Sequence, residues 1–405
     1  MRGDLRHNVA ALGADYALFV VGLAFASQST ILPAFAAHLG APNVVIGAIP
    51  AVMTLGWFLP SLFAAGYTES LARKLPFIVR YTIWERVPFI VLSLAAFFLA
   101  DRAPAAALGL MLLMLLVVTG VGGVLMPAWM DVIGRAIPVT LRGRFFAFAN
   151  LAASVGGLGG SVATASILAA VPAPASYGVC FACTTVFLAL SYVALVAVRE
   201  PATTESAPAT RLSEYLSRIP GLLGRDPNLS WFLTARAFGM VGSIGSAFYT
   251  VYALGAWDAP AAQAGVFTTL LFVGQMAGNA VLGWLADRRG HRLVIILGLG
   301  ATSLGVFGLA FVMLGFQIAA MNVSNLNVML EFAPGPAAQP TYIGLGTTLL
   351  APVAFGAPIA AGLLADVRGF VAVFAVAAVG ASVALALLLT RVRDPRAAAV
   401  TPRVA

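Results

Sequence analysis

The chain has 405 residues, of which 61% are hydrophobic and only 9% are charged, and its mean hydropathy is +0.97. An ordinary soluble domain carries about a quarter charged residues, so this composition excludes a soluble protein. Its apolar stretches are long enough to cross a hydrocarbon core of about 30 Å as helices, and they lack the alternation of barrel strands. We therefore expect an all-α integral membrane protein embedded in the lipid bilayer.

Twelve apolar segments are predicted to span the membrane. The ninth and tenth leave almost no loop between them, which predicts a short, tilted or partly broken hairpin at that point. The twelve segments are 11–35, 44–66, 77–99, 105–129, 146–171, 176–198, 229–254, 263–286, 293–312, 314–331, 341–364 and 370–390.

The cations indicate which side of the membrane each loop faces. The formal net charge is +8, and most Arg residues fall in the two termini and in every second loop, whereas Arg102 and Arg368 fall on the opposite side. Because cytoplasmic loops are enriched in Lys and Arg, we expect both termini in the cytoplasm and the protein in the cytoplasmic (inner) membrane of a prokaryote. The basic charge follows this topology and does not indicate nucleic acid binding.

A polar stretch divides the chain into two halves of six spans. Residues 199–228, rich in Pro, Thr, Ser and Glu, are predicted to form a cytoplasmic linker between residues 1–198 and residues 229–405. The halves repeat weakly, since residues 39–42 (Leu-Gly-Ala-Pro) precede the second span as residues 254–260 (Leu-Gly-Ala-Trp-Asp-Ala-Pro) precede the eighth. Such duplication is typical of transporters whose halves rock about a site near the middle of the membrane.

The loop after the eighth span is short and strongly charged. From Gly283 to Arg292 it reads Gly-Trp-Leu-Ala-Asp-Arg-Arg-Gly-His-Arg. It resembles the signature loop of the major facilitator superfamily, G-x-x-x-D-[RK]-x-G-[RK]-[RK]. At one position where the signature has Arg or Lys, this sequence has His291. The first-half copy is degraded, because Ser70 stands where the carboxylate belongs. The resemblance implies twelve transmembrane helices in two pseudo-symmetric six-helix bundles.

In this family such a loop resembles a latch between the halves, and the resemblance assigns a gating role to its matching residues. A helix-end turn with arginines reaching the interface is the alternative. The loop after the fourth span is similar to a basic loop of many members, with plain anchoring at the membrane surface as the alternative. The gating candidates are Asp131, Arg142, Arg144, Gly283, Asp287, Arg288, Gly290 and Arg292.

Ionisable residues inside predicted spans are costly and usually mark pathways or partners. Asp15, Glu85 and Arg236 are the candidates for proton coupling. Asp15 and Arg236 are expected to pair on the cytoplasmic side, or each to reach the interface alone. Glu85 is a candidate proton carrier, because shielding from water favours the neutral form of a carboxyl group; a fixed salt bridge is the alternative. Glu85 and Arg86 point about 100° apart on a helix, so we expect them to have different partners.

The resemblance further implies a substrate cavity lined by spans 1, 4, 7 and 10. A few amides and phenols in a cavity poor in cations suit a neutral or amphipathic solute, and hydrogen bonding between helices is the alternative role for the same side chains. The candidate substrate-binding residues are Gln28, Trp129, Tyr249, Tyr252, Gln275, Asn279, Asn322 and Asn325.

The sequence thus predicts a secondary active transporter that exports a small amphipathic or hydrophobic solute by alternating access, coupled to protons, and works as a monomer. A lipid or glycolipid translocase of the same fold and a non-transporting membrane scaffold or receptor are the alternatives. We expect no enzyme, no cofactor and no metal, because no span carries paired carboxylates and the three His residues lie near span ends. The sequence has no phosphate-binding loop, so we do not expect transport driven by ATP.

Overall fold

The structure, a computed structural model, describes residues 2–69, 71–200, 221, 223–224, 226–302, 307–333 and 339–394. These described residues form helices and no strands. Ten of the helical segments are long and apolar enough to cross a membrane, and two shorter apolar helices occupy residues 291–300 and 309–321. The all-helical membrane fold predicted from composition is therefore confirmed.

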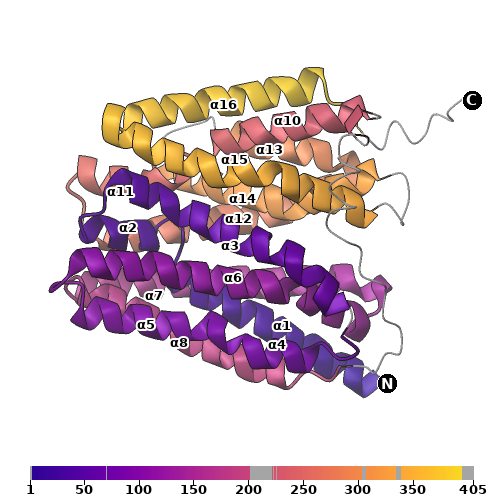
Figure 1. Cartoon of the computed structure of the whole chain (residues 1–405), viewed down its shortest axis with the longest axis horizontal. Helices are drawn as coiled ribbons and strands as arrows, with labels where there is room; N and C mark the ends of the chain where they lie inside the picture. Colours follow the sequence, from indigo (N-terminus) through magenta and orange to yellow (C-terminus); the bar gives the residue numbers. More distant parts are fainter. Residues whose placement is uncertain are drawn as a thin grey trace, which may run out of the picture. The chain divides into compact units, whose positions relative to one another are not determined.

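Figure 1 draws the helices in the colours of the sequence. The chain divides into two compact units. The first unit holds Met1–Leu212 and Thr250–Thr269, and the second holds Ser213–Tyr249 and Leu270–Ala405. Most of the predicted linker, namely residues 201–220, 222 and 225, lies outside the described residues. Within the first unit, the hydroxyls of Thr30 and Thr268 lie 2.6 Å apart, which ties the segment Thr250–Thr269 to that unit.

In the first unit, α1 packs against α7 and α8, α3 packs against α6, and α5 packs against α6 and α8. Leu12, Ile133 and Phe145 belong to its buried core. The helices are α1 (Arg2–Phe25), α2 (Ile31–His38), α3 (Asn43–Glu69), α4 (Leu75–Tyr81), α5 (Ile83–Phe98), α6 (Pro104–Ala136), α7 (Val139–Ala170) and α8 (Ala175–Val196).

In the second unit, α10 packs against α15 and α16, and α13 packs against α14. Phe232, Ile295 and Leu388 belong to its buried core. The helices that follow the linker are α10 (Pro227–Gly242), α11 (Ser246–Ala256), α12 (Ala262–Arg289), α13 (His291–Thr302), α14 (Phe307–Phe332), α15 (Gln339–Arg368) and α16 (Phe370–Thr390).

Three predicted spans are interrupted helices. The first is broken between Phe25 and Ile31, and the seventh between Gly242 and Ser246. These breaks fall in corresponding spans of the two halves, a pattern typical of transporters, whose discontinuous helices surround the transport pathway. The third span is interrupted at Thr82, which separates α4 from α5.

The predicted boundary between the ninth and tenth spans is wrong. We expected the ninth to end at residue 312 and the tenth to begin at residue 314, but α14 runs through both positions, from Phe307 to Phe332. The tenth span is therefore a full-length helix of 26 residues, and the described part of the ninth, α13, covers His291–Thr302. Uniformly apolar residues around position 312 give hydropathy nothing by which to locate a helix end.

Glycines allow two close helix crossings at related places in the halves. In α6, a β-carbon added at Gly123 would lie 2.7 Å from the carbonyl oxygen of Trp57 in α3. In α14, a β-carbon at Gly315 would lie 2.8 Å from the backbone nitrogen of Gln275 in α12. Small residues let membrane helices approach this closely, so the second and fourth spans of each half meet backbone to backbone.

Candidate functional site

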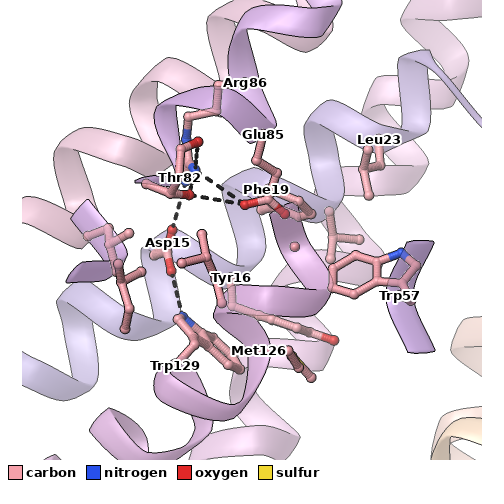
Figure 2. A pocket seen from close by; sticks show the side chains of 15 residues that line it. Asp15, Tyr16, Phe19, Leu23, Trp57, Thr82, Glu85, Arg86, Met126 and Trp129 are labelled. Carbon is pink, nitrogen blue, oxygen red and sulfur yellow. Dashed lines mark hydrogen bonds and ion pairs between the residues drawn. The ribbon is translucent and has the colours of Figure 1, made fainter. Parts of the chain in front are cut away.

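A cavity of about 220 Å³ lies inside the first unit. Helices α1, α3, α5 and α6 provide most of its walls. The walls are largely apolar and aromatic, and Figure 2 shows the charged side chains gathered on one side, opposite Trp57. The polar lining residues are Asp15, Tyr16, Thr82, Glu85, Arg86 and Trp129.

Asp15 is held by three helices besides its own. Its Oδ1 accepts a hydrogen bond from the hydroxyl of Ser191 on α8 (2.7 Å), and its Oδ2 accepts one from the indole of Trp129 on α6 (3.1 Å). Nη2 of Arg86, on α5, lies 3.7 Å from Oδ1. Since Asp15 is only 5% exposed, these contacts replace the water that a carboxylate would otherwise need.

Arg86 is the centre of the charged cluster. Its Nε donates to the carbonyl of Leu188 (2.9 Å), and its Nη2 donates to the hydroxyl of Ser191 (3.0 Å). Its Nη1 donates to the carbonyl of Thr82 (3.1 Å) and to the hydroxyl of the same residue. The guanidinium also lies over the ring of Phe19, 5.9 Å from its centre. Arg86 therefore joins α5 to α8 and faces both carboxylates.

Glu85 is attached to the cluster by one oxygen. Its Oε2 accepts from the hydroxyl of Thr82 (3.0 Å) and lies 3.7 Å from Nη1 of Arg86. Its Oε1 points to α6, because a β-carbon added at Gly122 would lie 2.8 Å from it. The expectation that Glu85 and Arg86 have separate partners is therefore wrong: their long side chains converge on Thr82, where the helix is interrupted.

The cluster holds two carboxylates and one guanidinium in a buried setting. Glu85 is 7% exposed and Arg86 is 8% exposed. Because an unbalanced charge in such a place is costly, a proton or another cation on one carboxylate would neutralise the set. Among the described residues, no group of three or more His, Cys, Asp or Glu side chains is arranged to hold a metal.

Of the predicted substrate-binding residues, Trp129 lines this cavity. Tyr249 belongs to an aromatic cluster of the second unit, with ring centres 6.2 Å from Phe311 and 5.5 Å from Phe374. Gln275 and Asn279 are partly buried on α12.

The remaining candidates are dispersed. Gln28 is exposed at the break between α1 and α2, and Tyr252 is partly buried on α11. The side chains of Asn322 and Asn325 lie outside the described part of the chain. Arg236 is 7% exposed on α10 of the second unit, and its pairing with Asp15 stays a prediction.

Asp131, a gating candidate, belongs to an ionic cluster at the end of α6. It pairs with Lys74 and with Arg135, whose Nη2 is 2.7 Å from Oδ2. Nη1 of Arg135 lies 3.8 Å from Oε1 of Glu200, and Glu200 also accepts from the backbone N–H groups of Lys74 and Leu75 at 2.9 Å. A carboxylate at this position satisfies free N–H groups at the start of α4.

Two arginine candidates for gating cap helix ends within their own units. Arg142 donates to the carbonyls of Ile137 (3.0 Å) and Gly134 at the end of α6, whereas Arg144 is exposed. Nε of Arg292 donates to the carbonyl of Leu388 near the end of α16 (3.2 Å). Cationic side chains commonly satisfy such terminal carbonyls.

The rest of the signature segment lies at the end of α12, and Gly290 separates it from the start of α13. Gly290 has a φ of 89°, a conformation that favours glycine, and Gly283 has no neighbour within 4 Å of an added β-carbon. The guanidinium of Arg288 lies 4.3 Å from the ring centre of Trp284. The side chain of Asp287 lies outside the described part, so its latch role stays a prediction.

His291, which replaces a basic residue of the signature, is buried between α13 and α14. Its Nδ1 lies 3.1 Å from the hydroxyl of Ser324, and its Nε2 lies 3.8 Å from Oε1 of Glu331. The histidine therefore meets a hydroxyl and a carboxylate of the neighbouring helix at a position where the signature has Arg or Lys.

Sequence inspection missed several members of the cavity and of its charged cluster. It noted Arg86 as a charge within a span without assigning it a role, and it gave no signal for Ser191, since a serine in an apolar helix is common. Trp57 and Gly122 stood among many other apolar residues. Only contacts between helices distant in sequence identify them.

The described residues form an all-helical polytopic membrane fold with two compact units. A family model described as Major Facilitator Superfamily matches residues 15–312, and the chain belongs to that family. No curated protein matches the sequence.

Solved structures of transporters share the fold. A mutant of the nucleoside transporter NupG has a TM-score of 0.70 and 13% identity over 95% of this chain and 99% of that chain. The D-xylose–proton symporter has a TM-score of 0.66 and 15% identity, covering 97% and 98%. The E. coli fucose–proton symporter FucP has a TM-score of 0.62 and 17% identity, covering 96% and 100%.

Proposed function

We propose that this protein is a secondary active transporter that exports a small amphipathic or hydrophobic solute by alternating access, driven by protons. The observation that carries the proposal is the buried cluster of Asp15, Glu85 and Arg86 on one cavity. Its surplus carboxylate offers a place for one proton, and burial makes binding that proton favourable. Glu85 is the proposed carrier, with Asp15 and Arg86 setting the charge around it.

The cavity walls support an amphipathic cargo. Apart from the charged cluster, the lining consists mainly of side chains such as Phe19, Leu23, Trp57 and Met126. Apolar walls with a few polar groups bind apolar bodies and orient them by one polar group. A sugar would leave most of its hydroxyls unpaired against such walls.

Proton coupling can be tested in vesicles. The purified protein is reconstituted with a pH-sensitive dye inside, and a solute panel is added under an imposed pH gradient. Solute-dependent proton movement is expected for the wild type and for Asp101→Asn, an exposed carboxylate outside the cluster, but not for Glu85→Gln. Unchanged proton movement in Glu85→Gln would remove the carrier role.

The same vesicles test the direction of solute transport relative to proton flow. Export coupled to protons requires solute and protons to move in opposite directions, so uphill solute movement against the proton flow is the expected result. Movement of both in one direction, as the name of the D-xylose–proton symporter states for that protein, would contradict efflux. We further propose that both termini face the cytoplasm of a prokaryotic cell and that the transporter works as a monomer.

A further inference from the structure

The hydrogen bonds of the cavity leave one carboxylate oxygen open. Both oxygens of Asp15 accept hydrogen bonds, from Ser191 and Trp129. Glu85 places Oε2 on Thr82 and Arg86. Within the described part of the chain, no donor approaches Oε1 of Glu85, although the residue is 7% exposed. The open oxygen is therefore a strong acceptor that faces the cavity.

The surroundings of this oxygen are aromatic. Figure 2 shows Glu85 between Thr82 and the ring of Trp57, with Phe19 beside it. Aromatic faces attract organic cations, most strongly when the site is dry. A carboxylate oxygen next to such faces matches a protonated amine better than a neutral solute, which would leave the charge of Glu85 unbalanced.

Space next to the oxygen depends on one glycine. A β-carbon at Gly122 would lie 2.8 Å from Oε1 of Glu85 and 2.7 Å from the six-membered ring of Trp57. Any larger residue would therefore press on both the acceptor and the aromatic wall. Gly120, on the same helix, has nothing within 4 Å of an added β-carbon.

We propose that the cavity binds a small organic amine in its ammonium form, which donates a hydrogen bond to Oε1 of Glu85 and rests its apolar body on Trp57, Phe19 and Met126. Gly122 keeps this subsite open. The proposal rests on the proposed transport function and names its substrate class: the ammonium group and the coupling proton supply the same missing positive charge, so one replaces the other at the cluster.

Three ligands of similar size but different charge distinguish the contribution of charge to binding from that of apolar contact. The full-length purified protein is titrated with 2-phenylethylamine, 2-phenylethanol and 3-phenylpropanoate, and binding is followed by tryptophan fluorescence and calorimetry. We expect the amine to bind at least tenfold more tightly than the alcohol and the carboxylate not to bind. Equal affinity for amine and alcohol in the wild type overturns the proposal without any variant.

Two substitutions then locate the subsite. Glu85→Gln is expected to abolish the preference for amine over alcohol, and Gly122→Ala to weaken amine binding at least tenfold, while Gly120→Ala and Asp101→Asn bind as the wild type does. If Glu85→Gln does not fold, as its melting curve would show, the Gly122→Ala and Gly120→Ala pair still decides. A retained preference in folded Glu85→Gln, or equal binding by the two glycine variants, overturns the proposal.

The outcomes also separate this inference from the transport function. Proton movement driven by a neutral solute, together with no amine preference, would reject the amine and keep the transporter. Amine binding at Glu85 in vesicles that never move protons would support the subsite and reject coupled transport.

Discussion

Asn8 on α1 holds the backbone of Arg199 by two hydrogen bonds: its Nδ2 donates to the carbonyl (2.8 Å), and its Oδ1 accepts from the N–H (2.9 Å). Asn228 on α10 makes the same pair of bonds to Arg393, at 3.0 and 2.7 Å. Each asparagine lies near the start of the first helix of its half and binds the backbone just after the last helix of the same half. The two clasps are therefore equivalent, which supports an internal duplication.

Removing the first clasp should weaken the first unit. In Asn8→Ala, the backbone N–H and carbonyl of Arg199 lose their hydrogen-bond partner, the side chain of Asn8, which is only 3% exposed. We expect this loss to cost about 1–3 kcal/mol of stability. The melting temperature in detergent measures the loss. Asn228→Ala, at a more exposed clasp, should lose less, and an equal or greater loss there would contradict this explanation.

Arg86 should matter more for stability than either carboxylate that it faces. Arg86→Met leaves Asp15 and Glu85 buried without a cation, and breaking a buried pair in this way costs about 3–5 kcal/mol. Asp15→Asn and Glu85→Gln each remove a charge but leave Arg86 its backbone acceptors at Leu188 and Thr82. Melting temperatures should therefore fall most in Arg86→Met. Comparable falls in all three variants would show that charge balance does not govern the cluster.

Two glycines of α6 should respond oppositely to alanine. Gly123→Ala places a methyl group 2.7 Å from the carbonyl oxygen of Trp57 and should destabilise the crossing of α3 and α6 by about 1–3 kcal/mol, as overpacking does. Gly120→Ala meets open space and should gain up to about 1 kcal/mol from helix propensity. Thermal unfolding of both variants makes the comparison, and destabilisation by Gly120→Ala as large as that by Gly123→Ala would exclude the close crossing as the cause.

Glu200 should fix the start of α4. Glu200→Ala removes the acceptor of two backbone N–H groups, at Lys74 and Leu75, and the partner of Arg135. We expect a loss of about 1–3 kcal/mol and faster hydrogen exchange at the start of α4, measured by mass spectrometry. Glu200→Gln retains an amide oxygen as acceptor and should exchange more slowly than Glu200→Ala. Identical exchange in the two variants would leave the carboxylate without a capping role.

Hydropathy located most spans but not their interruptions. The break after Phe25 falls at residues 27–30 and the break at Thr82 lies near Arg80, so both occur at polar residues inside spans that are apolar on average. A hydropathy average over about 19 residues hides such short polar interruptions. The boundary between the ninth and tenth spans was misplaced because the residues around position 312, inside α14, are apolar on both sides. A helix end is set by which backbone groups find partners, and a count of apolar residues does not record that.

The candidate site was found in part. Asp15 and Glu85 were recognisable because charges inside apolar spans are costly and therefore rare. Their partner Arg86 was expected to point elsewhere, because helical geometry alone does not include the interruption at Thr82 or the length of the two side chains. Ser191 lies 176 residues from Asp15 in the chain, so no local pattern connects them.

By itself, the sequence determined that the chain is an all-helical membrane protein of the major facilitator type, because water and lipid impose composition and span length on every segment. It also singled out the signature loop and the buried carboxylates. Only the tertiary structure decided which charges meet, that Oε1 of Glu85 faces a cavity, and that Gly122 opens it. These relationships depend on packing between helices far apart in the chain, and packing is a property of the folded whole.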